Sequence, residues 1–291
     1  MNNVYLVSTA HLEKSLWFKD DDDFKVGMNY VAIQAAECPT VEVLSFALMS
    51  NHVHFVFCGL KEKVMEFVNH FKHRYAVYLR HKYGTGAFLK RNHVDVRLIP
   101  YDNESVEWAI AYVQMNPVAA NISLHPTQYP WGSGNTFFSP SGISARRLSD
   151  LSVREKRRMF HTNADSLPGT WQVSPDGYIL PRSYVAVAKV ESLYRTPKRM
   201  NYFLTMSSKA RKKLEAGENL PAFRDQTILS AIPDLCRSLF QKGSVPELSD
   251  TEKSEMARQI RYRFSADANQ IARVCGMGYA DTARLLDEGC V

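Results

Sequence analysis

The sequence predicts an α+β protein, in which an antiparallel sheet carries helices on one face and a mainly helical, basic domain follows. Apolar and alternating runs typical of strands are interleaved with segments of helical period, in the order β-α-β-β-α-β-α. Charge separates the two parts. The 291 residues include 36 Lys+Arg and 30 Asp+Glu, but residues 1–141 have a net charge of −1 and residues 142–291 have +7. A basic second half indicates an anionic partner.

The first element is an apolar, β-branched run at residues 4–9, which predicts a strand. An acidic run from Asp20 to Asp23 follows and is interpreted as a solvated loop or a helix start. A metal site is not expected there, because the side chains of adjacent residues diverge. A helix is predicted over residues 25–37, and Pro39 stops it.

Two strand-like runs, residues 41–49 and 52–58, are separated by a plausible tight turn. Apolar and aromatic residues at helical spacing predict a helix over residues 62–82, and alternation predicts a strand over residues 94–99.

A further helix is expected to begin at Asn103 or Ser105, to run to about Met115 and to end at Pro117. Paired antiparallel strands with helices on one face give a sandwich of ferredoxin-like type for residues 1–125.

Residues 126–145 are dense in Pro, Gly and Ser and predict a linker or a wrapping loop. Residues 146–291 are predicted to form a mainly helical, DNA-binding extension. Within it, residues 251–287 resemble a helix-turn-helix, because two short amphipathic helices meet around Gly276 and Gly278. A plain helical hairpin is the alternative interpretation.

The five scattered cysteines form no CxxC pair, which argues against a disulfide framework and a cysteine zinc site. No apolar run is long enough for a bilayer, and the first residues lack the pattern of a signal peptide. A cytoplasmic protein without membrane contact is therefore expected.

His52 and His54, in LMSNHVHFVF, lie two residues apart in a predicted strand and therefore point to the same face. Two neighbouring imidazoles on a stiff strand make half of a site for a divalent metal ion. The alternative is a pair of surface histidines on an open sheet face. The apolar flanks favour a buried strand, where histidines without a function are less expected.

Tyr112 and Asn116, in AIAYVQMNPVAANI, lie four residues apart on one face of a predicted helix. A tyrosine can act as a nucleophile, and an amide oxygen can be a third, hard ligand to Mg²⁺ or Mn²⁺. The alternative is a core tyrosine followed by an Asn-Pro helix stop.

Cations alternate with aromatic residues from His70 to Arg97, a pattern typical of segments that bind phosphates and stack on unpaired bases. A solvated helix face is the alternative. The residues predicted to contact DNA are Lys72, Arg74, Tyr75, Arg80, Lys90, Arg91 and Arg97, with Arg273 and Arg284 in the helix-turn-helix-like segment.

Five segments follow one another along the chain in this order: LMSNHVHFVF, the basic helix with Tyr75, GTGAFLKRNHVDVRLI, AYVQMNPVAANI and QYPWGSG. Together they resemble the HUH (His-hydrophobic-His) single-tyrosine transposases, in particular the REP-associated branch, over roughly residues 1–135. The resemblance implies a ferredoxin-like HUH nuclease core. It also implies that His52 and His54 bind the metal ion with Asn116 as third ligand.

By the same resemblance, Tyr112 is the nucleophile that forms a 5′-phosphotyrosine bond with single-stranded, hairpin-bearing DNA. The chain departs from the family pattern at Ser50, Ala119 and Gly132, where the family has Pro, Arg and Ser. These departures bear on hairpin specificity more than on catalysis. A non-catalytic DNA-binding regulator derived from a transposase and a metal-dependent phosphodiesterase stay open as alternatives. A monomer or homodimer is expected.

Overall fold

The computed structural model describes residues 3–9, 16–84, 94–101, 104–139, 145–162, 167–206, 225–264, 266 and 268–287. Its first part follows the predicted order of strands and helices, so the α+β class is confirmed. The elements are β1 (Asn3–Ser8), α1 (Asp21–Glu37), β2 (Glu42–Met49), β3 (His52–Gly59), α2 (Lys61–Tyr83), β4 (Asp95–Ile99) and α3 (Ser105–Ala119).

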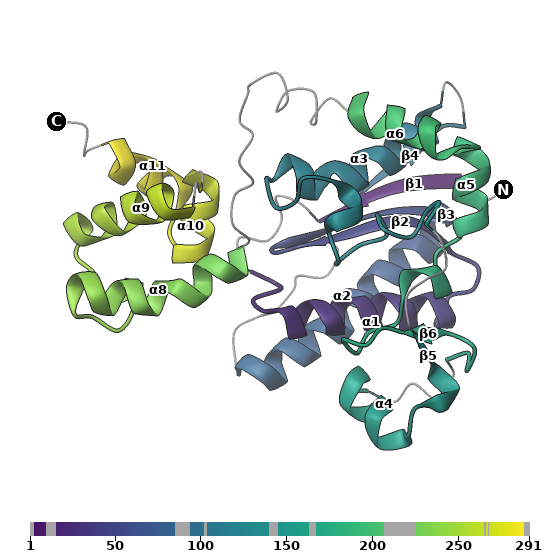
Figure 1. The fold of residues 1–291 in the computed structure, drawn as a ribbon, viewed down its shortest axis with the longest axis horizontal. Coiled ribbons are helices and arrows are strands. Elements are labelled where there is room, and N and C mark those ends of the chain that lie inside the picture. The colour runs from purple at the N-terminus through teal and green to yellow at the C-terminus, as the bar shows by residue number, and fades with distance from the viewer. Residues whose placement is uncertain are drawn as a thin grey trace.

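The four strands form one antiparallel sheet in the order β2-β3-β1-β4, with β1 and β3 in the centre (Figure 1). A register shift between Val43 and Ser45 of β2 sets the pairing of the rest of that strand. As a result, Ala47, His54, Ser8 and Asp95 are aligned across the four strands. Directly opposed residues of antiparallel strands share a face, so all four lie on the same side of the sheet.

Helices cover both faces of this sheet, which corrects the prediction of helices on one face. On one side, the rings of Phe55 and Phe57 lie 4.8–6.3 Å from Phe67, and Phe55 also contacts α2 further along. On the other side, the ring of His54 meets the ring of Tyr112 of α3. Because residues 53–59 of β3 are buried at every position, a second layer has to cover the histidine face.

The acidic run is a helix start. Asp20 caps α1 and accepts a hydrogen bond from the main-chain N–H of Asp23 at 2.9 Å. The side chain of Asp23 is fully buried and accepts hydrogen bonds from Tyr78 Oη at 3.0 Å and Lys82 Nζ at 2.8 Å. The run therefore also ties the start of α1 to the end of α2.

The predicted end of α3 at about Met115 is wrong, because the helix continues through Pro117 to Ala119. A proline inside a helix leaves a carbonyl of the preceding turn without its usual N–H donor. Here the side-chain amide of Asn116 donates to carbonyls of that turn.

Residues 129–133 follow a short 3₁₀ helix, η1 (Pro126–Gln128), and run along the outer edge of β2. Leu48 N donates to Trp131 O at 2.8 Å, and Gly132 forms a β-bridge with Ala47. A Cβ atom on Gly132 would lie 2.7 Å from the carbonyl oxygen of Phe46, so this approach requires glycine. The segment covers hydrogen-bonding groups of an edge strand.

The next elements belong to the same hydrophobic core as the sheet, which extends to Leu204. They are β5 (Arg146–Arg147), η2 (Leu148–Asp150), α4 (Val153–Phe160), β6 (Gln172–Val173), η3 (Pro181–Ser183), α5 (Val187–Tyr194) and α6 (Pro197–Met206). The predicted boundary at residues 126–145 therefore differs from the division of the described core residues, which falls after residue 206.

A second core is made by the last helices and stands apart from the first in Figure 1. Its elements are α8 (Asp225–Phe240), η4 (Val245–Glu247), α9 (Asp250–Phe264), α10 (Ala268–Cys275) and α11 (Tyr279–Asp287). Among the described residues, no helix combines the length and the apolar character that crossing a membrane requires.

Candidate active site

His52 and His54 project from β3 towards the sheet face that α3 covers. Their rings lie 4.8 Å apart at 90°, and His54 is only 1% exposed. The strand between them is held by Thr9, whose hydroxyl oxygen accepts from Val53 N at 2.9 Å and whose N–H donates to Val53 O at 3.1 Å. The two imidazoles are therefore placed by a rigid, hydrogen-bonded backbone.

A neighbouring amide orients the first histidine. His52 Nδ1 lies 2.8 Å from Asn51 Oδ1. An amide oxygen can only accept a hydrogen bond, so in this contact His52 donates from Nδ1. The other ring nitrogen, Nε2, then carries the lone pair that can bind a metal ion. Such outer hydrogen bonds are typical of metal-binding histidines.

Tyr112 lies on α3 above the histidine pair. Its ring centroid is 5.8 Å from that of His54 at an angle of 88°, and the side chain is half-buried. The phenol thus meets the histidine pair edge-on while keeping part of its surface in solvent. A phenol with this partial exposure can be reached by a molecule from solvent.

Segments far along the chain hold α3 in place. Tyr194 Oη of α5 donates to Glu107 O at 2.6 Å, and Arg199 of α6 forms an ion pair with Glu104 at 2.6 Å. Trp108 packs its ring 4.7 Å from Phe203. No sequence motif marks these supporting residues, because a contact between elements that far apart leaves no local pattern.

Asn116 follows Tyr112 by one helical turn and is 5% exposed. Its Nδ2 donates to Tyr112 O at 2.8 Å, so Oδ1 is the atom of this amide with ligand chemistry. Among the described residues no group of three or more His, Cys, Asp or Glu comes together. Imidazole nitrogens and amide oxygens are neutral donors of the kinds that divalent cations accept.

Three residues of α2 that were predicted to contact DNA are buried or paired within the protein. Lys72 is 2% exposed and Tyr75 is fully buried, with its hydroxyl donating to Trp17 O at 2.8 Å. Burial also raises the pKa of the Tyr75 phenol well above its usual value. Arg74 pairs with Glu37 at 2.9 Å. Side chains buried in this way have no surface to offer DNA, which corrects the prediction of DNA contacts for Lys72 and Tyr75.

The other predicted DNA contacts are distributed over both parts of the chain. Arg97 is exposed on β4, opposite Leu6, and this register puts it on the same sheet face as His54. Arg80 is exposed near the end of α2, and Arg284 is exposed on α11. Arg273 of α10 contacts the buried carboxylate of Asp225 at 2.7 Å. Lys90 and Arg91 lie outside the described residues.

Fold and site define an α+β protein whose sheet carries a histidine pair beneath a tyrosine on a covering helix. Residues 6–94 match the family model described as transposase IS200 like, so the resemblance is confirmed for this part of the chain. The match includes both histidines and ends before Tyr112 and Asn116. It indicates an enzyme of the DNA-cleaving transposase kind. Comparisons with curated proteins and with solved structures gave no match.

Proposed function

We propose that the protein is a metal-dependent DNA strand transferase that uses Tyr112 as its nucleophile on single-stranded, hairpin-bearing DNA. The observation that carries this proposal is the 5.8 Å contact between the rings of Tyr112 and His54, which are distant in the sequence. The strand order, in which β3 lies between β1 and β2, supports a ferredoxin-like HUH core.

The reaction exchanges one phosphodiester bond for another. The Oη of Tyr112 attacks the phosphorus and loses its proton as the new O–P bond forms. The bond from phosphorus to the 3′ oxygen breaks, and that oxygen takes up a proton and leaves as a 3′-OH. A Mg²⁺ or Mn²⁺ ion held by His52, His54 and Asn116 would offset the charge that develops on the phosphate. A 3′-OH that later attacks the phosphotyrosine rejoins DNA without hydrolysis.

The DNA strand is proposed to follow exposed cations on the histidine face and beyond it. Arg97 stands on that face, and Arg80 and Arg284 are exposed elsewhere in the chain. Cation contacts to phosphates release counterions, so the affinity for DNA should fall steeply as salt rises.

A covalent-adduct assay tests the proposal. The full-length protein is incubated with labelled hairpin-bearing single strands and Mn²⁺, and a denaturing gel separates covalent from free DNA. We expect an adduct band that disappears in Tyr112→Phe and persists in Tyr202→Phe, which removes the hydroxyl of a tyrosine that is 52% exposed on α6. An adduct that survives Tyr112→Phe would overturn the assignment. So would the absence of adduct across a broad oligonucleotide pool with bound Mn²⁺.

A non-catalytic DNA-binding regulator is the second candidate, favoured by the separate core of the last helices. It predicts that His52→Ala leaves DNA affinity unchanged and that no strand is ever cleaved. Turnover of a small phosphodiester that is unaffected by Tyr112→Phe would instead indicate a phosphodiesterase.

A further inference from the structure

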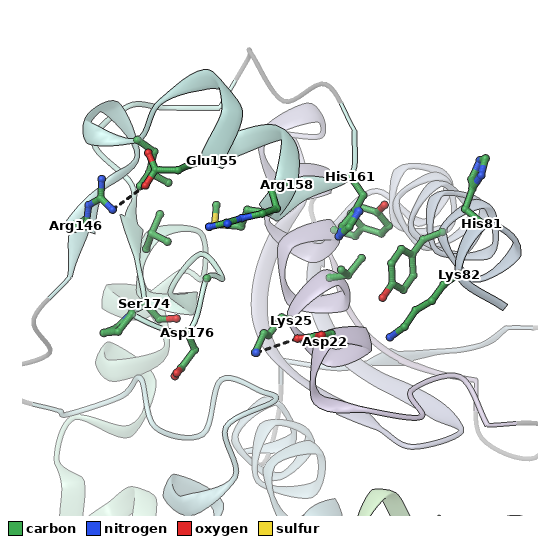
Figure 2. A pocket seen from close by; sticks show the side chains of 18 of the residues that line it. Asp22, Lys25, His81, Lys82, Arg146, Glu155, Arg158, His161, Ser174 and Asp176 are labelled. Atoms are coloured by element: carbon green, nitrogen blue, oxygen red, sulfur yellow. Dashed lines mark hydrogen bonds and ion pairs between the residues drawn. The ribbon is translucent and has the colours of Figure 1, made fainter. Parts of the chain in front are cut away.

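A cavity of about 1210 Å³ lies on the side of the sheet that α1 and α2 cover, away from Tyr112. One wall comes from α1 and α2, and the other from lining residues within 146–161 and 173–177, which lie beyond the family match (Figure 2). Apolar and aromatic side chains form much of the lining: Val26, Tyr30, Val77, Tyr78, Met159 and Val173. The proposed strand transfer makes no use of this cavity.

A single buried side-chain amide holds the two segments that form the second wall, the end of α4 and the loop after β6. Asn29 of α1 is fully buried, and its Nδ2 donates to Met159 O and to Gly177 O, each at 3.2 Å. Its Oδ1 accepts from Ile179 N at 2.9 Å. The hydrogen-bonding groups of Asn29 are thus engaged with the two segments that border the opening. The cavity is therefore preformed and not a gap between loosely packed parts.

Most charges around the cavity are matched locally. Lys25 pairs with Asp22 at 3.1 Å, and Arg146 pairs with Glu155 at 3.1 Å. Lys82 pairs with the buried Asp23 at 2.8 Å. These pairs leave little net charge in the lining.

Arg158 and Asp176 differ from those pairs. Each is exposed and adjoins a residue that Asn29 holds, Met159 in one case and Gly177 in the other. Neither forms an ion pair within the described part of the chain. Both line the cavity, Arg158 from α4 and Asp176 from the loop after β6 (Figure 2). The site thus offers a guanidinium and a carboxylate on the two segments that Asn29 holds.

We propose that this cavity binds a nucleotide unit whose phosphate contacts Arg158 and whose base donates its exocyclic amino group to Asp176. A guanidinium binds phosphate oxygens well, and a carboxylate accepts from the amino group of cytosine. The half-buried apolar side chains of the lining, Val77 and Met159, provide a surface for the flat base. Thymine has no amino group and should bind less well. The inference rests on the proposed function where the nucleotide is part of a DNA strand.

Fluorescence anisotropy on the Tyr112→Phe background tests the assignment without interference from cleavage. The probes are labelled (dC)₈ and (dT)₈ at several salt concentrations. We expect (dC)₈ to bind about tenfold more tightly than (dT)₈, and Asp176→Ala to abolish this preference. Arg158→Ala should weaken both probes and reduce the salt dependence by about one phosphate contact. Arg154→Ala, on the same helix but outside the lining, is the control and should change affinity much less.

Competition with dCMP and TMP distinguishes a free nucleotide from one within a strand. Displacement of (dC)₈ by micromolar dCMP but not by TMP would assign the cavity to a free nucleotide. Binding seen only with the oligonucleotides would assign it to a DNA strand.

The inference would be overturned if Arg158→Ala and Asp176→Ala kept the parent's affinities in both the direct binding and the competition experiments. The melting temperatures of the two variants must match that of the parent. Because the binding assay does not depend on Tyr112, a failed adduct assay leaves it intact. Likewise, unaltered binding in these variants would leave strand transfer untouched.

Discussion

The side-chain amide of Asn116 donates a 2.8 Å hydrogen bond to the main-chain carbonyl of Tyr112. The same Nδ2 lies 3.4 Å from the carbonyl oxygen of Val113, which has lost its usual helical donor because Pro117 has no N–H. The amide thereby helps α3 to continue past its proline. It also joins the proposed metal ligand to the backbone of the proposed nucleophile, so that the position of each constrains the other.

Asn116→Asp should destabilise the protein even in the absence of metal. A carboxylate cannot donate to the carbonyls of Tyr112 and Val113 and would place like partial charges together. We expect the free energy of unfolding to fall by about 1–3 kcal/mol, measured by urea denaturation. The double variant with Pro117→Ala restores a backbone N–H to Val113 O and should recover part of this loss. Unaltered stability of Asn116→Asp would show that the amide hydrogen bonds contribute nothing.

Metal affinity should depend on the histidine pair and on the amide that orients it. We expect His52→Ala and His54→Ala to abolish Mn²⁺ binding in isothermal titration calorimetry. Asn51→Ala should weaken it by about 10-fold or more, because the hydrogen bond at His52 Nδ1 is lost. His73→Ala, at an exposed position on α2, is the matched control. Equal Mn²⁺ affinity in His54→Ala and His73→Ala would contradict the proposed site.

Arg273 and Arg284 should behave differently although both are basic residues of the last helices. Arg273→Ala leaves the fully buried carboxylate of Asp225 without its cation, so stability should fall by about 2–4 kcal/mol. Arg284→Ala changes an exposed residue and should instead weaken DNA binding and lower its salt dependence. Urea denaturation and fluorescence anisotropy separate the two effects. A stable Arg273→Ala protein with weakened DNA binding would show that Arg273 acts mainly on DNA.

Gly132→Ala should destabilise the segment that covers β2. Its new Cβ would lie 2.7 Å from the carbonyl oxygen of Phe46, and relief of this clash would disturb the bridge to Ala47. We expect a loss of about 1–3 kcal/mol in thermal or urea denaturation. Gly169→Ala is the control, because a Cβ there would meet Ser149 Cβ at 3.4 Å, an ordinary contact. Equal stability of the two variants would contradict the tight approach.

Two helix starts should weaken in acid. The pKa of Glu155 is lowered to about 2, first by the hydrogen bond from Ser152 N. The pKa of Glu252 is also lowered to about 2, first by its hydrogen bond with Lys242. A carboxyl whose pKa falls on folding contributes stability that is complete above its unfolded value, near 4.5, and is lost as the pH falls towards 2. Urea midpoints should therefore decrease between pH 5 and 2, and less so in Glu252→Gln. An equal decrease in that variant would exclude Glu252 as a cause.

Local pattern in the sequence by itself determined the order of strands and helices in the first part. It also determined that His52 and His54 share a sheet face, because alternation in a strand depends only on neighbouring residues. The helical face shared by Tyr112 and Asn116 follows from helical periodicity in the same way.

Tertiary structure alone decided which face of the sheet α3 covers and therefore that Tyr112 meets His54. It also decided that Lys72 and Tyr75 are buried and that Asn29 brings Arg158 and Asp176 to one cavity. Such outcomes depend on contacts between residues many positions apart. The same local pattern is compatible with several packings, and only the burial of the whole core selects one of them.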